Sequence, residues 1–110
     1  MAKRIPKRVR SILKEVREEL QWIYLDRLKE IILFGSYARG DAAEGSDIDI
    51  VLLLEDVKDI YAEREKYFPV TSRISLKYDT VVSVIPFDSR EFRRKKTPLI
   101  LNIGKEGIPV

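Results

Sequence analysis

The sequence predicts an α/β fold, of the α+β type, in which a small mixed β-sheet is packed by helices. Three observations support this fold class. An apolar pattern of helical period covers the start of the chain, two short apolar runs follow it, and a run of β-branched residues comes late. The chain has 110 residues, a length that suits one domain, so residues 1–110 are predicted to form a single domain.

The first half of the chain is predicted to form a helix, two strands and the turn between them. Residues 6–26 are predicted to be helical because their apolar residues recur every three or four positions: Val9, Ile12, Leu13, Val16, Leu20 and Ile23. Residues 31–34 are continuously apolar and predict a buried strand that ends at Gly35. A short helix is expected over residues 36–39, a polar loop over 40–45 and a second strand over 47–54.

The second half is predicted to contain a helix, a strand and two further helices. A charged segment that starts at residue 56 keeps a helical pattern to Ile74, and Pro69 is expected to break or bend it. Residues 80–85 are rich in β-branched side chains and predict a third strand. One more helix is expected to start at Ser89, and another to cover residues 98–103 with Gly104 as its C-cap.

The composition restricts the chemistry that the chain can carry. Cysteine and histidine are both absent, which excludes disulfides, thiolate or histidine-ligated zinc, and Ser-His-Asp catalysis. Catalysis would depend on carboxylates, backbone amides, Lys, Arg, Tyr or Ser, and the hard oxygen ligands among these select Mg²⁺ or Mn²⁺. No apolar run is long enough to span a bilayer and the basic start lacks an apolar signal core, so we expect no membrane association and a cytoplasmic location.

Basic residues gather in two segments although the net charge is only +3. The early cluster is Lys3, Arg4, Lys7, Arg8 and Arg10, and the late cluster is Arg90, Arg93, Arg94, Lys95 and Lys96. Such clusters can bind nucleic acid or phosphate. A solvated surface is the favoured interpretation, because acidic residues interleave with most of the remaining basic ones, and nucleic-acid binding is the weaker alternative.

Two carboxylates, Asp47 and Asp49, interrupt the second predicted strand. Residues i and i+2 of a strand point to the same face, about 6.6–6.8 Å apart, so both acids are expected on one face and Ile48 and Ile50 on the other. Two acids beside apolar neighbours are costly unless they are paired. Bound metal ions would resolve that cost, so the pair is a candidate metal site, and a capped turn with a salt bridge is the alternative.

The turn at Gly35 and Ser36 is the candidate phosphate site. Backbone N–H groups at the start of a helix attract phosphate oxygens, and a glycine lets the ligand approach the backbone closely. The turn matches neither a Walker A loop nor a dinucleotide fingerprint. If the second strand returns as a hairpin, Asp47 and Asp49 lie beside this turn, and metal and triphosphate share one site. An ordinary strand-to-helix turn is the alternative.

Asp79 is the candidate for a third carboxylate. It stands at the start of the third predicted strand, where it would share a face with Ser83. There it would fix the metal and accept the proton of an attacking hydroxyl, and a simple turn residue is the alternative. Asp88, at the far end of the same strand, is interpreted as a helix cap.

Residues 35–40 (GSYARG) and 46–49 (SDID) together resemble the signature of the DNA polymerase β-like nucleotidyltransferase superfamily. The short chain resembles the minimal nucleotidyltransferase branch, relatives of kanamycin nucleotidyltransferase. The resemblance implies a nucleotidyltransferase fold and transfer of a nucleoside monophosphate, AMP from ATP as first choice, to a hydroxyl with Mg²⁺. The residues it implies for metal and catalysis are Asp47, Asp49 and Asp79, and those for the nucleotide are Gly35, Ser36, Arg39 and Ser46.

The resemblance also implies partners. Minimal members often pair with a small helical HEPN-type protein, and in some toxin–antitoxin pairs the nucleotidyltransferase is an antitoxin that AMPylates its partner. A domain of this size leaves the acceptor to a partner or a homo-oligomer. The alternative function is a weakly catalytic or non-catalytic binding partner that neutralises the toxin by complex formation.

Several side chains keep a second interpretation. Arg39 could contact phosphate or could pair with Asp41 or Glu44. Ser46 is more suited to stabilising the loop than to chemistry. Tyr37 could stack on a base or pack inside the domain, and Trp22 is expected in the core or at an interface.

Overall fold

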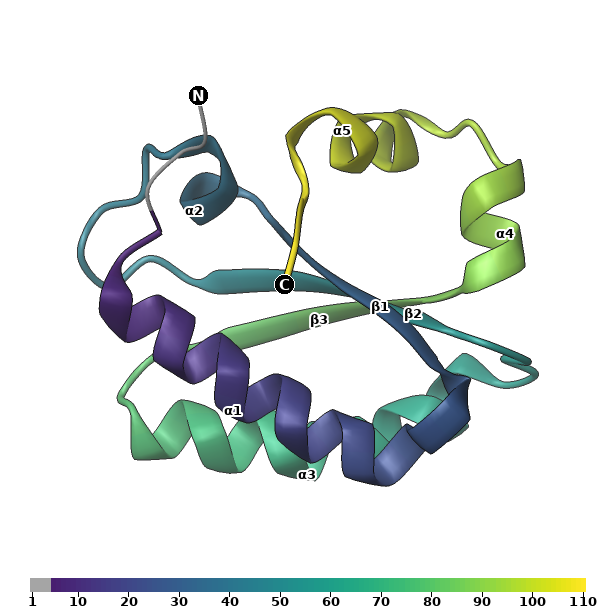
Figure 1. Cartoon of the computed structure of the whole chain (residues 1–110), viewed down its shortest axis with the longest axis horizontal. Helices are drawn as coiled ribbons and strands as arrows, with labels where there is room; N and C mark the ends of the chain where they lie inside the picture. The colour runs from purple at the N-terminus through teal and green to yellow at the C-terminus, as the bar shows by residue number, and fades with distance from the viewer. Residues whose placement is uncertain (1–4) are drawn as a thin grey trace.

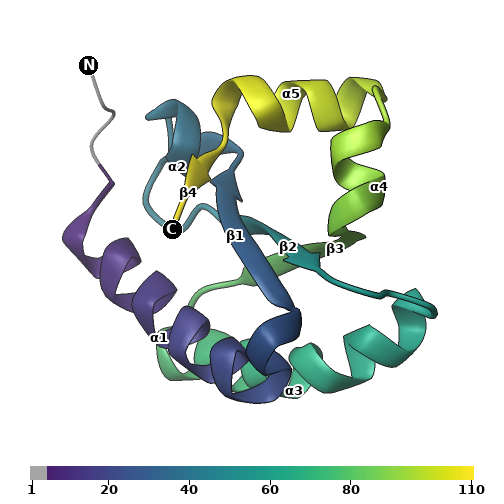
Figure 2. The same ribbon diagram turned by 45° about the vertical axis from the view of Figure 1, so that its right-hand side comes forward.

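A computed structural model describes residues 5–110 of the chain, so Lys3 and Arg4 of the early basic cluster lie outside the described residues. Four strands form one mixed sheet in the order β3-β2-β1-β4. Figure 1 shows β1, β2 and β3, and the short β4 is labelled in Figure 2. Strand β1 (Leu28–Phe34) is antiparallel to β2 (Ile48–Leu54) and to the short β4 (Ile108–Pro109), whereas β2 is parallel to β3 (Val82–Asp88). The predicted small mixed sheet is confirmed.

Two long helices cover one face of the sheet. Helix α1 (Lys7–Tyr24) continues into a 3₁₀ turn, η1 (Leu25–Arg27), and lies beside α3 (Ile60–Lys77), as both views show (Figures 1 and 2). Their buried residues pack on one set of alternating strand residues, which includes Leu33, Ile48 and Ile50. Because α3 connects the parallel strands β2 and β3, it must cross over a face of the sheet.

Three shorter helices complete the fold. Helix α2 (Ser36–Arg39) follows β1, and α4 (Ser89–Arg94) and α5 (Pro98–Glu106) come after β3. A second core cluster on the other face of the sheet joins Val51 and Leu53 of β2 to Ile103 of α5. No helix among residues 5–110 is long and apolar enough to cross a membrane.

Two predictions for the second half were wrong in their boundaries. Helix α3 is not broken at Pro69 and runs to Lys77, with Tyr67 before the proline and Ile74 after it both buried. Helix α5 extends past Gly104 to Glu106, and it is followed by Gly107. A Cβ at Gly107 would lie 2.5 Å from the Ile103 carbonyl oxygen, so the close return of the chain towards β4 requires glycine there.

Strand boundaries also shifted from those predicted. Strand β1 starts at Leu28 and not at residue 31. Its first three residues were missed because they are not fully buried and do not belong to the continuous apolar run on which the prediction was based. Strand β3 starts at Val82 and runs through Pro86, which an edge strand tolerates because one side of it needs no hydrogen-bond donor. Strand β4 was not predicted, because two residues are too short for any periodic pattern.

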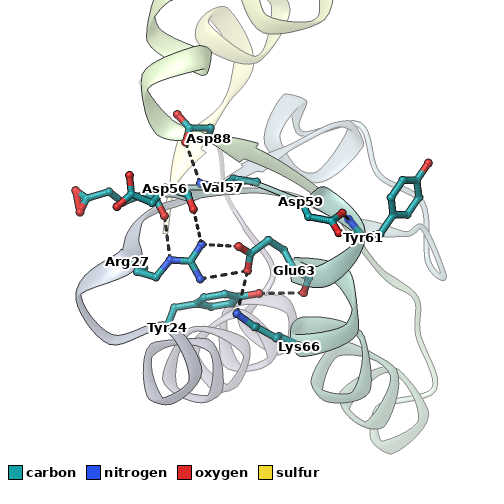
Figure 3. Close-up of polar contacts among 10 residues, drawn as sticks. Tyr24, Arg27, Asp56, Val57, Asp59, Tyr61, Glu63, Lys66 and Asp88 are labelled. Atoms are coloured by element: carbon teal, nitrogen blue, oxygen red, sulfur yellow. Dashed lines mark hydrogen bonds and ion pairs between the residues drawn. The ribbon is translucent and has the colours of Figure 1, made fainter.

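A polar network connects helix α3 to the end of the sheet that lies away from Gly35 (Figure 3). Arg27 pairs with Glu63 of α3, which is only 4% exposed, and Arg27 Nε donates to the Glu55 carbonyl oxygen at 3.0 Å. Tyr24 Oη donates to the Glu63 carbonyl oxygen at 3.1 Å. Arg27 of η1 therefore holds the buried carboxylate of α3 and Tyr24 of α1 binds the backbone of the same residue, which ties the α1–β1 connection to α3.

Candidate active site

The two acids lie at the start of β2, on the face opposite the α1–α3 layer. Asp47 immediately precedes β2 and Asp49 lies within it, while Ile48 and Ile50 are fully buried in the larger core. Alternation along the strand therefore puts both carboxylates on one face, as predicted. Asp47 is exposed and Asp49 is half-buried, so the pair opens to solvent at the N-terminal end of the inner strand β2.

Gly35 lies directly against Asp49. The predicted hairpin return is confirmed, because antiparallel β1 and β2 put Phe34 opposite Asp49. Gly35 has φ +75°, and a Cβ built on it would lie 2.5 Å from Asp49 Oδ2. Any other residue would collide with the carboxylate and would adopt this backbone conformation only with strain. The glycine thus allows the turn and the carboxylate to share one site.

Helix α2 begins at this turn. The amides of Ala38 and Arg39 donate to the Gly35 carbonyl oxygen at 3.1 and 3.0 Å. The amides of Ser36 and Tyr37 precede them and have no acceptor within the helix, as at every helix start. These two free amides directly follow Gly35, the residue that lies against Asp49.

The electrostatics of Asp49 show an excess of negative charge. Burial raises the pKa of its carboxyl above the ordinary value, the charge of Asp47 raises it further, and the charge of Arg39 opposes both effects. Among residues 5–110, no Lys or Arg nitrogen comes within salt-bridge distance of either acid. A cation bound here would relieve the repulsion.

The donor set fits a hard divalent cation that also binds a substrate. Mg²⁺ is commonly held by one or two carboxylates together with substrate phosphates and water. Asp47 and Asp49 supply two carboxylates, and the turn at Gly35 lies directly against the carboxylate of Asp49. The two acids would hold the ion, and a triphosphate would supply further oxygen ligands.

Arg39 and Ser46, both assigned to the nucleotide from the sequence, have protein partners. Arg39 Nε donates to Asp41 Oδ2 at 3.2 Å, and its Nη1 lies 3.7 Å from Glu106 Oε2 of α5. Ser46 Oγ accepts the Ala43 amide at 2.9 Å. The alternatives of an Asp41 pair and of a loop-stabilising serine are therefore confirmed. The Glu106 contact was missed because it joins helices that are remote in sequence.

The predicted three-carboxylate clamp is wrong, because the structure does not bring Asp79 to the pair. Asp79 lies before β3, in a turn with φ +50°, and lines a cavity of about 500 Å³ with Arg8 and Gly45, a cavity that neither Asp47 nor Asp49 lines. Residues 5–110 contain no group of three His, Cys, Asp or Glu side chains placed to hold one metal ion.

The residue beside Asp49 on β3 is a serine. Ser83 is the parallel-strand partner of Asp49. The error on Asp79 arose because β3 begins later than predicted, at Val82. Asp79 would share the face of Ser83 only if the strand included residue 79.

The structure gives the exposure of the two aromatic residues that had two interpretations from the sequence. Tyr37 is 9% exposed and belongs to the larger core, so packing is its role. Trp22 is 82% exposed, so it is not part of the core.

Asp88 caps α4 as predicted, because its Oδ1 accepts hydrogen bonds from the amides of Arg90 and Glu91 at 2.9 and 3.2 Å.

Comparison with known proteins agrees with this geometry. Residues 13–107 match the family model described as a nucleotidyltransferase domain. A candidate protein adenylyltransferase of Methanocaldococcus jannaschii is 37% identical over 100 residues, which cover 91% of this chain and 96% of the relative. The protein adenylyltransferase MntA of Thermococcus cleftensis is 34% identical over 76 residues, 67% of this chain and 73% of the relative.

The fold has matches among solved structures as well. A toxin–antitoxin crystal structure with AMP-PNP contains a chain that superposes with a TM-score of 0.60 at 26% identity. The match covers 91% of this chain and 69% of that chain. The sheet, the helices on both of its faces and the order of the elements are therefore those of known nucleotidyltransferase structures.

Proposed function

The chain belongs to the nucleotidyltransferase domain family, and on this premise we propose that it transfers AMP from ATP to a hydroxyl group of a protein. The contact between Gly35 and Asp49 carries the proposal, because it joins a phosphate-binding turn to a pair of unneutralised carboxylates. The relatives named as protein adenylyltransferases support both AMP as the group transferred and a protein as the acceptor.

Different residues of the chain would bind the triphosphate and the metal ion. The amides of Ser36 and Tyr37 would bind phosphate oxygens and orient the triphosphate, and Asp47 and Asp49 would hold Mg²⁺ or Mn²⁺. The metal supplies positive charge that offsets the charge developing on the phosphates during transfer. The oxygen of the acceptor hydroxyl forms a bond to the α-phosphorus and releases its proton to water. The bond between the α-phosphorus and the oxygen that bridges to the β-phosphate breaks, and pyrophosphate leaves.

Arg39 and Ser46 would act indirectly. Arg39, held by Asp41 and Glu106, contributes positive charge near Asp49 without pairing with it. Ser46 would keep the loop before β2 in place, which positions Asp47. Arg39 would turn to phosphate only if the nucleotide displaced its present partners.

For the acceptor we propose a HEPN-type toxin that forms a complex with this chain. The toxin–antitoxin structure with AMP-PNP supports a toxin as the partner, and the relative named a protein adenylyltransferase supports a protein as the acceptor. The HEPN type of the toxin is taken from the resemblance to the minimal nucleotidyltransferase branch. The assignment makes the chain the antitoxin of the pair. A cytoplasmic location remains part of the proposal.

The test uses ATP labelled at its α-phosphate, together with the purified chain and a purified HEPN-type candidate partner. We expect label on the partner in the presence of Mg²⁺ and none with the Asp47→Asn variant. Co-expression tests the alternative of neutralisation by binding alone. If Asp47→Asn combined with Asp49→Asn neutralised the toxin as well as the unchanged chain does, and no label were transferred, the catalytic proposal would fail.

A further inference from the structure

A concave surface lies between α4 and α5, apart from the two acids. Its volume is about 370 Å³, and it is lined by residues of both helices and of the segment that joins them. The two helices run in different directions where they meet, as Figure 2 shows. Phe92 and Leu101 contribute apolar surface to it, and Arg93, Lys96 and Lys105 contribute cations. We refer to this surface as the α4–α5 groove.

The cations of the groove are not neutralised by neighbours. Within residues 5–110, no carboxylate lies within 4.0 Å of the charged groups of Arg93, Lys96 or Lys105. The acid of the adjoining helix, Glu91, is already paired with Arg94 and Lys95. The groove therefore keeps a positive charge over an apolar floor.

Apolar side chains at the groove are exposed or only partly covered. Leu101 is 48% exposed, although it lies in a helix whose Ile100 and Ile103 are buried. Phe92 is half-buried, with its ring edge-on to Phe87 at a centroid distance of 5.2 Å. Together the Phe92 ring and Leu101 give a ligand apolar surface to cover, at about 25 cal/mol per Å² buried.

Gly104 is the least expected residue of the groove. It lies inside α5, where glycine costs about 1 kcal/mol relative to alanine. A Cβ at this position would meet nothing within 4 Å, so no close packing inside the chain requires glycine here. The missing side chain instead leaves the helix backbone bare where it lines the groove.

We propose that the α4–α5 groove binds a peptide segment of a partner protein in which carboxylates alternate with apolar side chains. Its carboxylates would pair with Arg93, Lys96 and Lys105, and its apolar side chains would cover Leu101 and approach the backbone at Gly104. A nucleic-acid backbone fits less well. Each of its phosphodiesters is charged and hydrated, so the backbone has no apolar group to cover Leu101 and Phe92. The inference does not depend on nucleotide transfer.

The experiment measures binding of a fluorescent ten-residue peptide of alternating Glu and Leu to the full chain, by anisotropy and without nucleotide. Lys96→Glu combined with Lys105→Glu should weaken binding about tenfold, because two exposed ion pairs are lost and two charges reversed. The control variant, Lys7→Glu combined with Lys14→Glu, makes the same change in net charge on α1 and should bind as the unchanged chain does.

A third variant separates binding from folding. Gly104→Leu improves the helix propensity of α5, so its melting temperature should stay the same or rise while its side chain fills the groove and weakens peptide binding. The proposal is overturned if the peptide does not bind saturably, or if the α1 control loses as much affinity as the groove variant. Tighter binding of a ten-nucleotide oligothymidine that displaces the peptide would also overturn it, in favour of nucleic acid.

Discussion

Replacing Gly35 with alanine tests the contact on which the candidate site depends. The new Cβ would lie 2.5 Å from Asp49 Oδ2, whereas ordinary contacts begin near 3.4 Å, so the carboxylate would have to move by about 0.9 Å. The backbone at Gly35, with φ 75° and ψ −155°, lies in a region that is essentially restricted to glycine and costs other residues about 1–3 kcal/mol.

The expected result has a stability part and an activity part. Gly35→Ala should lower the free energy of unfolding by about 2–4 kcal/mol, from backbone strain and the collision together. Displacement of a catalytic group by about 1 Å should reduce transfer about a hundredfold. Urea denaturation measures the first quantity, and transfer of labelled AMP at saturating ATP measures the second.

A double-mutant cycle isolates the contact with Asp49. In an Asp49→Ala background the collision is removed, so Gly35→Ala should cost about 1–2 kcal/mol less than it does in the unchanged chain. Gly45→Ala is the matched control, because Gly45 also has positive φ, at +83°, but its Cβ would meet nothing within 4 Å. The same cost for Gly35→Ala in both backgrounds would refute the reasoning.

Three further predictions follow from the same structure. Without metal, Asp49→Asn should stabilise the chain at pH 7 by about 1 kcal/mol, estimated for carboxylates about 6.7 Å apart at an effective dielectric constant of about 50. The raised pKa of Asp49 means that ionisation costs folding energy, so this gain should vanish below about pH 4 in a series of urea titrations; a gain that persisted there would contradict it. Asp88→Ala should cost about 1 kcal/mol through loss of the α4 cap. Hydrogen bonds from backbone amides, that of Val57 foremost, lower the pKa of Asp88, so its contribution is present above about pH 4 and should be lost as pH falls through the lowered value; a cost that did not shrink in acid would refute this. Arg27→Ala should lower stability by about 3 kcal/mol, because it leaves Glu63 buried without its main partner, and adding Glu63→Leu should restore most of the loss; no recovery in thermal melts would argue against the ion pair as the cause.

The part of the site that could be predicted from sequence is the part that local geometry determines. The alternation of Asp47 and Asp49 with Ile48 and Ile50 assigns the two sets to opposite faces without any knowledge of the neighbouring strands. Gly35 at the end of an apolar run likewise indicates a turn. Both features survive in the structure because each depends on a few consecutive residues.

The errors concern residues whose positions depend on distant parts of the chain. Asp79 was predicted to be the third acid because it directly precedes a run of β-branched residues and was placed at the start of the third strand. The start of β3 is instead determined by its pairing with β2, which puts Ser83 beside Asp49. The pairing of Arg39 with Glu106 depends on how α5 packs against the sheet. Trp22 lies two residues after the buried Leu20, about 200° further around the helix, so helical spacing already places it away from the core, and its role at an interface stays a prediction.

Equilibrium binding of a non-hydrolysable ATP analogue tests the central claim most directly, because the claim is that the turn at Gly35 and the acids form one metal–triphosphate site. Calorimetric titration of the unchanged chain with AMP-PNP should show binding with Mg²⁺ that is lost on chelation with EDTA. Asp47→Asn combined with Asp49→Asn should abolish the Mg²⁺-dependent binding while leaving the circular dichroism spectrum unchanged. Equal affinity with and without Mg²⁺, or in the folded double variant, would contradict the claim.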